Sequence, residues 1–287
     1  MKSCFCLEIS APAGRDAELL SGFLALHAPH GWEEQDVSDA ETLFRICSEH
    51  AGYVLKVRNA VQESMPGLIC RLAELEGRDW LSAWREYFTP VACGTRFVVL
   101  PPWLARHQDF SNRTPIIIDP KSAFGTGHHA TTVLCLRALS DLLDSGRIRP
   151  GRKFLDLGTG SGVLAIACSR SGLAGLALDI DQLAVENALE NKRLNRAENF
   201  EVRNGGPELA AEYAVDGAYG VILANILAGP LVEFAPALAG ILAGDGCLIL
   251  SGILENQADE VEAAYRAEGL QEAGRIHDEG WVALVWS

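Results

Sequence analysis

From Pro150 onward the chain repeats one pattern: a short apolar run, a glycine-rich turn and a stretch with helical spacing of apolar residues. The predicted elements are, in order, strand 153–157, helix 162–171, strand 175–179, helix 182–194, and strands 200–202, 219–224 and 247–251. Strands that alternate with helices form a mostly parallel sheet with helices on both faces. The sequence therefore predicts an α/β, Rossmann-like domain, with residues 281–286 as an antiparallel edge strand.

The beginning of the chain predicts a smaller unit of a different kind. Its periodicity indicates, in order, strand 5–9, helix 16–28, strands 42–46 and 53–57, and helix 63–75. This mixture favours a small α+β domain. A helix with Trp80, Trp84 and Phe88 on one face, then a strand at 97–100 between prolines, is expected to form a linker. The expected domains are residues 1–78, 79–102 (the linker) and 103–287.

A glycine-rich loop with the pattern DxGxGxG connects the strand at 153–157 to the next helix. It contains Asp156, Gly158, Gly160 and Gly162. Glycines allow a tight turn and a close approach of the backbone to a ligand, and the new helix offers unpaired N–H groups. The loop is not GxxxxGK[ST] and has no lysine to meet a phosphate, which argues against a nucleoside triphosphate site. A nicotinamide-dependent dehydrogenase is a weaker alternative, because its fingerprint is GxGxxG.

Two polar residues end later strands of the same predicted sheet. Asp179 ends the strand at 175–179, where a carboxylate can accept hydrogen bonds from ribose hydroxyls, whereas Asp181 fits the cap of the following helix. Asn225 follows the strand at 219–224, and its amide oxygen could accept a hydrogen bond from an incoming amine; a turn-forming role is the alternative. Because ligands of open parallel sheets bind at the carboxyl ends of the strands, both residues are candidate site residues.

The segment at 119–132 is a third candidate ligand loop. Phe124 and Gly125 lie in it, followed by His128, His129 and Thr131, which opens a predicted helix. Adjacent histidine side chains point apart, and no HExxH motif or cysteine partner is near. We therefore expect no metal site here.

Five segments of the chain resemble one protein family in sequence and in order. They are residues 79–90, 119–129, 156–167, 224–231 and 250–254. They are similar to the ribosomal protein L11 methyltransferase (PrmA) family of class I S-adenosylmethionine-dependent methyltransferases. The most specific part is Phe-Gly-Thr-Gly at 124–127 combined with Asn-Ile-Leu-Ala at 225–228. The resemblance covers residues 79–287 well and the N-terminal domain weakly.

The resemblance implies an S-adenosylmethionine site and a protein substrate. The cofactor-binding residues that it implies are Thr131, Gly158, Asp179 and Asn225, with Phe124 and Gly125 lining the site and Gly160 in the same glycine loop. It also implies that the N-terminal domain presents ribosomal protein L11, whose lysine side chains or N-terminal α-amine receive the methyl groups. We expect Asn225 to be the catalytic residue, orienting the neutral amine while water takes the proton. A lysine methyltransferase with another protein substrate and a non-catalytic S-adenosylmethionine-binding module are the alternatives.

Charge and cysteine usage limit the partners and the compartment. The 24 Lys and Arg residues against 38 Asp and Glu residues leave a net charge of −14, which argues against general nucleic-acid binding and suits a basic protein. No signal peptide or membrane helix is expected. The 8 cysteines are scattered without a CxxC pair, which favours buried free thiols in a reducing cytoplasm. We expect a cytoplasmic monomer that binds a basic ribosomal protein, with no direct nucleic-acid or membrane contact.

Overall fold

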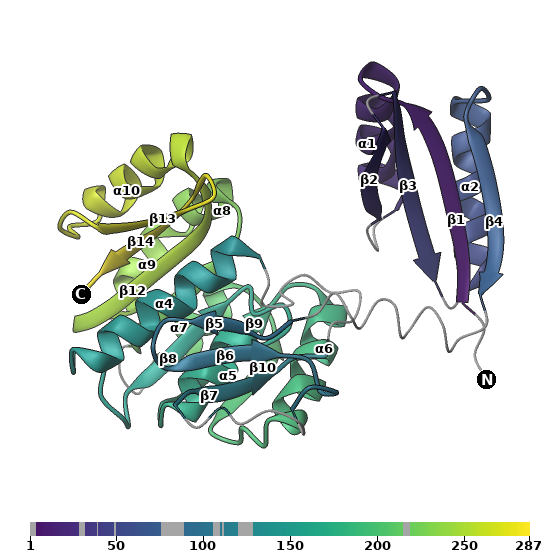
Figure 1. The fold of residues 1–287 in the computed structure, drawn as a ribbon. Helices are drawn as coiled ribbons and strands as arrows, with labels where there is room; N and C mark the ends of the chain where they lie inside the picture. Colours follow the sequence, from purple (N-terminus) through teal and green to yellow (C-terminus); the bar gives the residue numbers. More distant parts are fainter. Residues whose placement is uncertain are drawn as a thin grey trace. The chain divides into compact units, whose positions relative to one another are not determined.

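The protein has two compact units, Met1–Phe88 and Thr89–Ser287. The computed structural model describes residues 4–28, 32–38, 40–48, 50–75, 89–105, 110, 112–119, 129–214 and 219–287. Each unit is described here by itself (Figure 1). The predicted linker helix lies outside the described residues, whereas the predicted linker strand is β6 of the second unit. The functional division of the chain stays a prediction.

The first unit is an α+β sandwich. Its elements are β1 (Cys4–Pro12), α1 (Arg15–His27), β2 (Glu33–Ser38), β3 (Glu41–Ser48), α2 (Ala51–Ser64) and β4 (Ile69–Leu75). The strands form a sheet in the order β2-β3-β1-β4, in which β1 is antiparallel to both β3 and β4. Alternate residues of β1, Leu7 and Ile9, are fully buried with Leu20 and Leu24 of α1. Every second residue of the strand and one face of the helix thus pack together in one core.

Two local predictions in this unit are wrong. Residues 53–57 belong to α2 rather than to a strand, and residues 69–75 form β4 rather than a helix. The valines of α2 suggested a strand, but Val54, Val57 and Val61 are buried at helical spacing against the sheet. Residues 69–75 form a strand because they pair with β1, and this pairing outweighs the weak helical spacing of their apolar residues.

The expectation that all cysteines are free thiols is also wrong. Cys6 in β1 and Cys47 in β3 form a disulfide. They face each other in the antiparallel register of the two strands, although 41 residues separate them in the chain. The spacing of cysteines in a sequence does not reveal such a register, which long-range strand pairing sets. The other cysteines whose side chains are described are free, namely Cys70, Cys93, Cys135, Cys168 and Cys247.

The second unit is built on a seven-stranded sheet in the order β10-β9-β8-β11-β12-β14-β13 (Figure 1). The strands are β8 (Lys153–Leu157), β9 (Ala174–Asp179), β10 (Phe200–Asn204), β11 (Tyr219–Asn225), β12 (Leu242–Leu254), β13 (Gly274–Asp278) and β14 (Trp281–Trp286). The first five strands in the sheet order are parallel, and β14 is antiparallel to both its neighbours. The predicted terminal strand is therefore antiparallel, but β13 rather than β14 is the edge strand. Mostly exposed side chains hid β13 in the sequence.

Helices cover both faces of this sheet. The helices on one face are α4 (Ala130–Asp144), α5 (Val163–Arg170) and α6 (Gln182–Leu194). Those on the other are α7 (Pro207–Tyr213), α8 (Ala228–Glu233), α9 (Ala235–Ile241) and α10 (Ala258–Ala267), which follows the short helix η1 (Glu255–Gln257). Neighbouring residues of β8, Phe154 and Leu155, enter opposite cores, so the strand is apolar throughout. The predicted α/β fold is confirmed.

A second, three-stranded sheet joins the core on the α4–α6 side. It contains β5 (Val91–Cys93), β6 (Phe97–Leu100) and β7 (Thr114–Ile117), with β6 in the middle. Phe97, Val99 and Ile116 are buried in the same cluster as α4 and α5. Within the part of the chain that the structure describes, no helix has the length and apolar content that a bilayer crossing requires.

Candidate functional site

The strand order reverses next to β8, and three predicted site residues meet at that point. The chain passes from β8 through β9 to β10 on one side and then returns to β11 on the other. Leu157 of β8 pairs with Leu178 and with Ala224, so the residues that follow these three, Gly158, Asp179 and Asn225, lie side by side at the carboxyl edge of the sheet. Open parallel sheets bind ligands at such a switch point, at the carboxyl ends of the strands.

The backbone of the glycine loop after β8 is held by a set of hydrogen bonds. The N–H groups of Gly158 and Thr159 donate to the carbonyl of Leu178 over 2.8 and 2.9 Å. The N–H of Gly160 donates to Oδ2 of Asp179 over 2.9 Å. Gly158, Gly160 and Gly162 have φ angles of 73°, 54° and 83°, which glycine adopts without steric cost. The loop conformation thus explains the glycines that the sequence motif contains.

Close packing against the next loop also requires glycine. A Cβ on Gly158 would lie 2.3 Å from Cγ2 of Ile226, and a Cβ on Gly252 would lie 2.3 Å from the carbonyl oxygen of Ile226. The Ile226 N–H donates to the carbonyl of Ser251 over 3.2 Å. Ile226 is therefore wedged between two glycine turns, which places Asn225 against the glycine loop.

Asp156 supports the loop from the interior of the protein. Its side chain is fully buried, and Oδ2 accepts hydrogen bonds from Oγ1 of Thr159 at 2.6 Å and from the N–H of Ala165 at 3.0 Å. The other oxygen, Oδ1, is buried without a hydrogen-bond partner among the described residues. Burial raises the pKa of Asp156 to about 7, because it removes water from the charged form. The side chain joins the turn to the first turn of α5.

Asp179 and Asp181 have different environments: the predicted cap role of Asp181 is confirmed, whereas both carboxylate oxygens of Asp179 accept backbone N–H groups and its ribose contact stays a prediction. Oδ1 of Asp179 accepts from the N–H of Asp181 at 3.0 Å, while Asp181 caps α6 through the N–H of Leu183 at 2.9 Å. The side chain of Asn204, at the end of β10, donates to the carbonyls of Asp179 and Ile180 over 3.1 and 3.0 Å. This role of Asn204 was not predicted from the sequence, although the residue precedes a Gly-Gly pair at the same sheet edge.

The start of α4 lies against Asn225. Nδ2 of Asn225 donates to Oγ1 of Thr132 over 3.3 Å, which uses the donor side of the amide. Thr131 is buried and lies beside the N-cap residue His129, whose Nδ1 is 2.8 Å from its Oγ1. The His129 ring in turn lies edge-on to Trp281, with centroids 5.1 Å apart. The structure therefore brings Thr131 to the Asn225 side of the site, whereas Phe124 and Gly125 lie outside the described residues.

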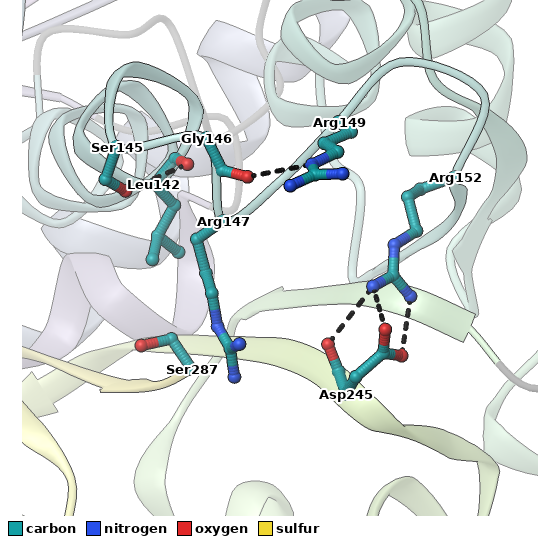
Figure 2. Close-up of a pocket in the computed structure, with 8 residues that line it drawn as sticks. All are labelled: Leu142, Ser145, Gly146, Arg147, Arg149, Arg152, Asp245 and Ser287. Carbon is teal, nitrogen blue, oxygen red and sulfur yellow. Dashed lines mark hydrogen bonds and ion pairs between the residues drawn. The ribbon is translucent and has the colours of Figure 1, made fainter.

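A polar cavity of about 580 Å³ lies at the opposite, amino edge of the sheet. Its lining residues are Leu142, Ser145, Gly146, Arg147, Arg149, Arg152, Asp245 and Ser287. Figure 2 shows the guanidinium of Arg152 turned onto Asp245, with contacts of 2.8 and 2.5 Å to its carboxylate. Arg149 donates to the carbonyl of Gly146 over 3.4 Å. None of the predicted site residues lines this cavity, so we take the carboxyl edge as the candidate functional site.

Comparison with known proteins shows that the amino-acid sequence of this chain is similar to one family. The family model described as ribosomal protein L11 methyltransferase (PrmA) matches residues 25–287. The ribosomal protein L11 methyltransferase of Symbiobacterium thermophilum is 38% identical over 216 residues, which are 75% of this chain and 67% of the relative. That of Chloroflexus aurantiacus is 40% identical over 233 residues, 74% of this chain and 69% of the relative. The chain spans about two thirds of the length of these curated relatives.

A solved structure agrees with the sequence matches. The crystal structure of a ribosomal protein L11 methylase from Lactobacillus delbrueckii subsp. bulgaricus has a TM-score of 0.61 and 31% identity. The match covers 70% of this chain and 98% of that chain. The chain belongs to the ribosomal protein L11 methyltransferase (PrmA) family.

Proposed function

We propose that this protein transfers methyl groups from S-adenosylmethionine to amino groups of ribosomal protein L11. The observation that carries the proposal is the row of Asp179, Gly158 and Asn225 at the point where the strand order reverses. Membership in the PrmA family supports the same reaction and substrate. The accepting groups are lysine side chains, the N-terminal α-amine or both.

The residues at this edge fit a nucleoside better than a phosphate. The carboxylate of Asp179 suits ribose hydroxyls, and the glycine loop presents backbone rather than side chains, with no lysine in it. Thr131, Gly158, Gly160, Asp179 and Asn225 would hold the cofactor, together with Phe124 and Gly125 of the preceding loop. When bound, S-adenosylmethionine supplies a methyl group that its sulfonium already activates.

The chemistry that remains for the protein is mainly alignment. The attacking amine needs a lone pair, so a lysine with an ordinary pKa of about 10.4 must lose its proton before transfer. Removal of water at the site lowers the pKa of such an amine. Asn225 already uses Nδ2 as a donor to Thr132, which leaves its amide oxygen to accept a hydrogen bond from the neutral amine. That bond would hold the nitrogen in line with the methyl group while water takes the proton.

Presentation of the substrate is the role that we assign to the first unit. The net charge of −14 favours encounter with a basic ribosomal protein and disfavours general contact with nucleic acid. The reaction requires no second copy of the chain and no membrane, so a monomer acting in the cytoplasm is the proposed state.

A labelled transfer experiment tests this function. The purified protein is incubated with methyl-labelled S-adenosylmethionine and ribosomal proteins from cells that lack its gene. We expect label on L11 and little elsewhere. Label on another protein would show that this other protein, rather than L11, is the substrate. Cofactor binding without transfer would favour a non-catalytic binding module. Binding of a nicotinamide cofactor instead would indicate a dehydrogenase.

A further inference from the structure

Three buried asparagines follow one another at intervals of four residues, two in α6 and one at its C-cap. They are Asn187, Asn191 and Asn195, with exposed fractions of 7%, 0% and 5%. A buried amide is unfavourable unless its donors and acceptor are paired. These side chains therefore need hydrogen-bond partners, and one of them, Asn191, contacts the glycine loop.

The side chain of Asn191 joins two segments that are far apart in the sequence. Its Nδ2 donates to the carbonyl of Ser161 in the glycine loop over 2.9 Å. Its Oδ1 accepts from the N–H of Asp119, which follows β7, over 3.0 Å. One amide therefore fixes the distance between the loop and the segment that leaves the three-stranded sheet.

Asn195 makes a similar number of bonds but none to the loop. Its Oδ1 accepts from the N–H of Ile117 at 2.8 Å, and its Nδ2 donates to the carbonyls of Ile117 and Asn191 at 2.6 and 2.8 Å. Asn195 thus ties β7 to α6 and nothing else. Asn195 therefore bonds only to the fold around the loop, whereas Asn191 also bonds to the loop itself.

The bond to Ser161 links the backbone of the glycine loop to α6. Gly158, Thr159 and Gly160 are held by the end of β9, through Leu178 and Asp179. The peptide that follows Ser161 leads directly into α5, and the Ala188 side of α6 packs against Gly162, where a Cβ would meet Ala188 at 3.2 Å. The Gly162 N–H donates to the carbonyl of Thr159 over 2.8 Å and closes the turn, while the Asn191 bond sets how far the Ser161 carbonyl lies from α6.

We propose that Asn191 is a positioning residue for cofactor binding. Its amide holds the Ser161 half of the glycine loop at a set distance from Asp119, so that the loop backbone faces the ligand without reorganisation. Asn191 itself is fully buried, so it acts through the backbone of the loop. The inference rests on the proposed S-adenosylmethionine site and adds to it a residue on α6.

The test compares two matched variants, Asn191→Leu and Asn195→Leu. Both replace a buried amide on the same helix with an apolar side chain of similar shape, and both are expected to lower the melting temperature by similar amounts. Calorimetric titration with S-adenosylhomocysteine should show an affinity loss of about tenfold for Asn191→Leu and less than about twofold for Asn195→Leu. Turnover at saturating cofactor should stay within about twofold in both, because chemistry is not changed. Equal affinity losses in the two variants, or none in Asn191→Leu, would overturn the proposal.

A second variant keeps the test decisive if Asn191→Leu does not fold. Asn191→Ala removes the bonds to Ser161 and Asp119 without adding the bulk of a leucine side chain. It should weaken binding of S-adenosylhomocysteine in the same direction, and unchanged binding would contradict the inference. If the unaltered protein fails to bind S-adenosylhomocysteine, the proposed function itself is wrong; if it binds and the variants behave alike, only the role of Asn191 is wrong.

Discussion

The two edges of the seven-stranded sheet hold their polar groups in different ways. At the carboxyl edge, backbone N–H groups of the glycine loop bond to Leu178 and Asp179, and the supporting carboxylate of Asp156 is fully buried. At the amino edge, Arg152 and Asp245 form an ion pair whose side chains are 28% and 69% exposed. The first arrangement fixes a backbone shape, and the second neutralises charge in contact with water.

The comparison predicts that the concentration of charge at the amino edge does not mark the functional site. The amino edge has three arginines around a cavity, yet the Arg152 guanidinium is already paired with a carboxylate. The carboxyl edge has fewer charges, but its backbone and its two strand-end side chains, Asp179 and Asn225, converge on one place. Fixed dipoles and hydrogen-bonding groups at a switch point are what a nucleoside and an amine require. Four experiments can break or sharpen this contrast.

The largest effect is expected for Asn225→Ala. Loss of the amide leaves the incoming amine without its orienting acceptor, and misplacement of a reacting atom costs roughly 100-fold in turnover. Binding of S-adenosylhomocysteine should fall by less than about tenfold. Labelled transfer to L11 and calorimetry measure the two quantities. Full turnover with unchanged cofactor affinity would exclude the proposed role of Asn225.

The next effect is expected for Asp179→Ala. A hydrogen bond to a charged group contributes about 1.5–3 kcal/mol, so losing the ribose contact should weaken cofactor binding by about 10- to 150-fold. Asp181→Ala is the matched control, since that carboxylate caps α6 through Leu183 only two residues away. It should lower the melting temperature but leave S-adenosylhomocysteine affinity nearly unchanged. Similar affinities for the two variants would argue against a ribose site at Asp179.

The raised pKa of Asp156 predicts that the stability of the protein depends on pH. Its pKa of about 7 in the folded protein lies above the ordinary value of 3.8, because burial disfavours the charged form. Between these values the folded state keeps a proton that the unfolded chain releases. A rise in pH through this window therefore lowers the free energy of unfolding, by about 2 kcal/mol from this group between pH 5 and 7.

Urea unfolding at several pH values checks this prediction. In the Asp156→Asn variant the side chain at this position stays neutral. The free energy of unfolding of the variant should therefore decrease less than that of the unaltered protein as the pH rises from 5 to 7. The difference between the two profiles isolates this carboxyl from the other acidic groups of the chain. Parallel profiles would mean that Asp156 is not protonated in the folded state.

The smallest effect is expected at the amino edge. Arg152→Ala and Asp245→Ala break an exposed ion pair, so methyl transfer and S-adenosylhomocysteine binding should stay within about twofold of their original values. The same assays as for Asn225 measure both. A large loss of transfer in either variant would show that the arginine cavity takes part in function, and the contrast between the edges would fail.

Local features of the chain explain which predictions succeeded. Strands β8, β9 and β11 are short apolar runs, and Gly158 requires a backbone angle that other residues avoid. These signals depend on neighbours in the sequence, so they can be read before the chain folds. The cap at Asp181 is local in the same sense, because its partner is two residues away.

Features set by distant partners were missed. The disulfide between Cys6 and Cys47 depends on the register of two strands, and the strand β4 on its pairing with β1. Asn191 sits on a helix whose spacing alone does not say what its buried amide meets. Each case requires knowledge of which segments lie side by side.

The α/β alternation, the glycine loop and the strand-end positions of Asp179 and Asn225 follow from the amino-acid order, because periodicity and backbone freedom are properties of neighbouring residues. Folding in three dimensions places these groups in one row, packs Ile226 between two glycine turns, and lets Asn191 bond to both the loop and Asp119. Strand order and register arise from contacts between segments far apart in the chain, and no local pattern encodes them.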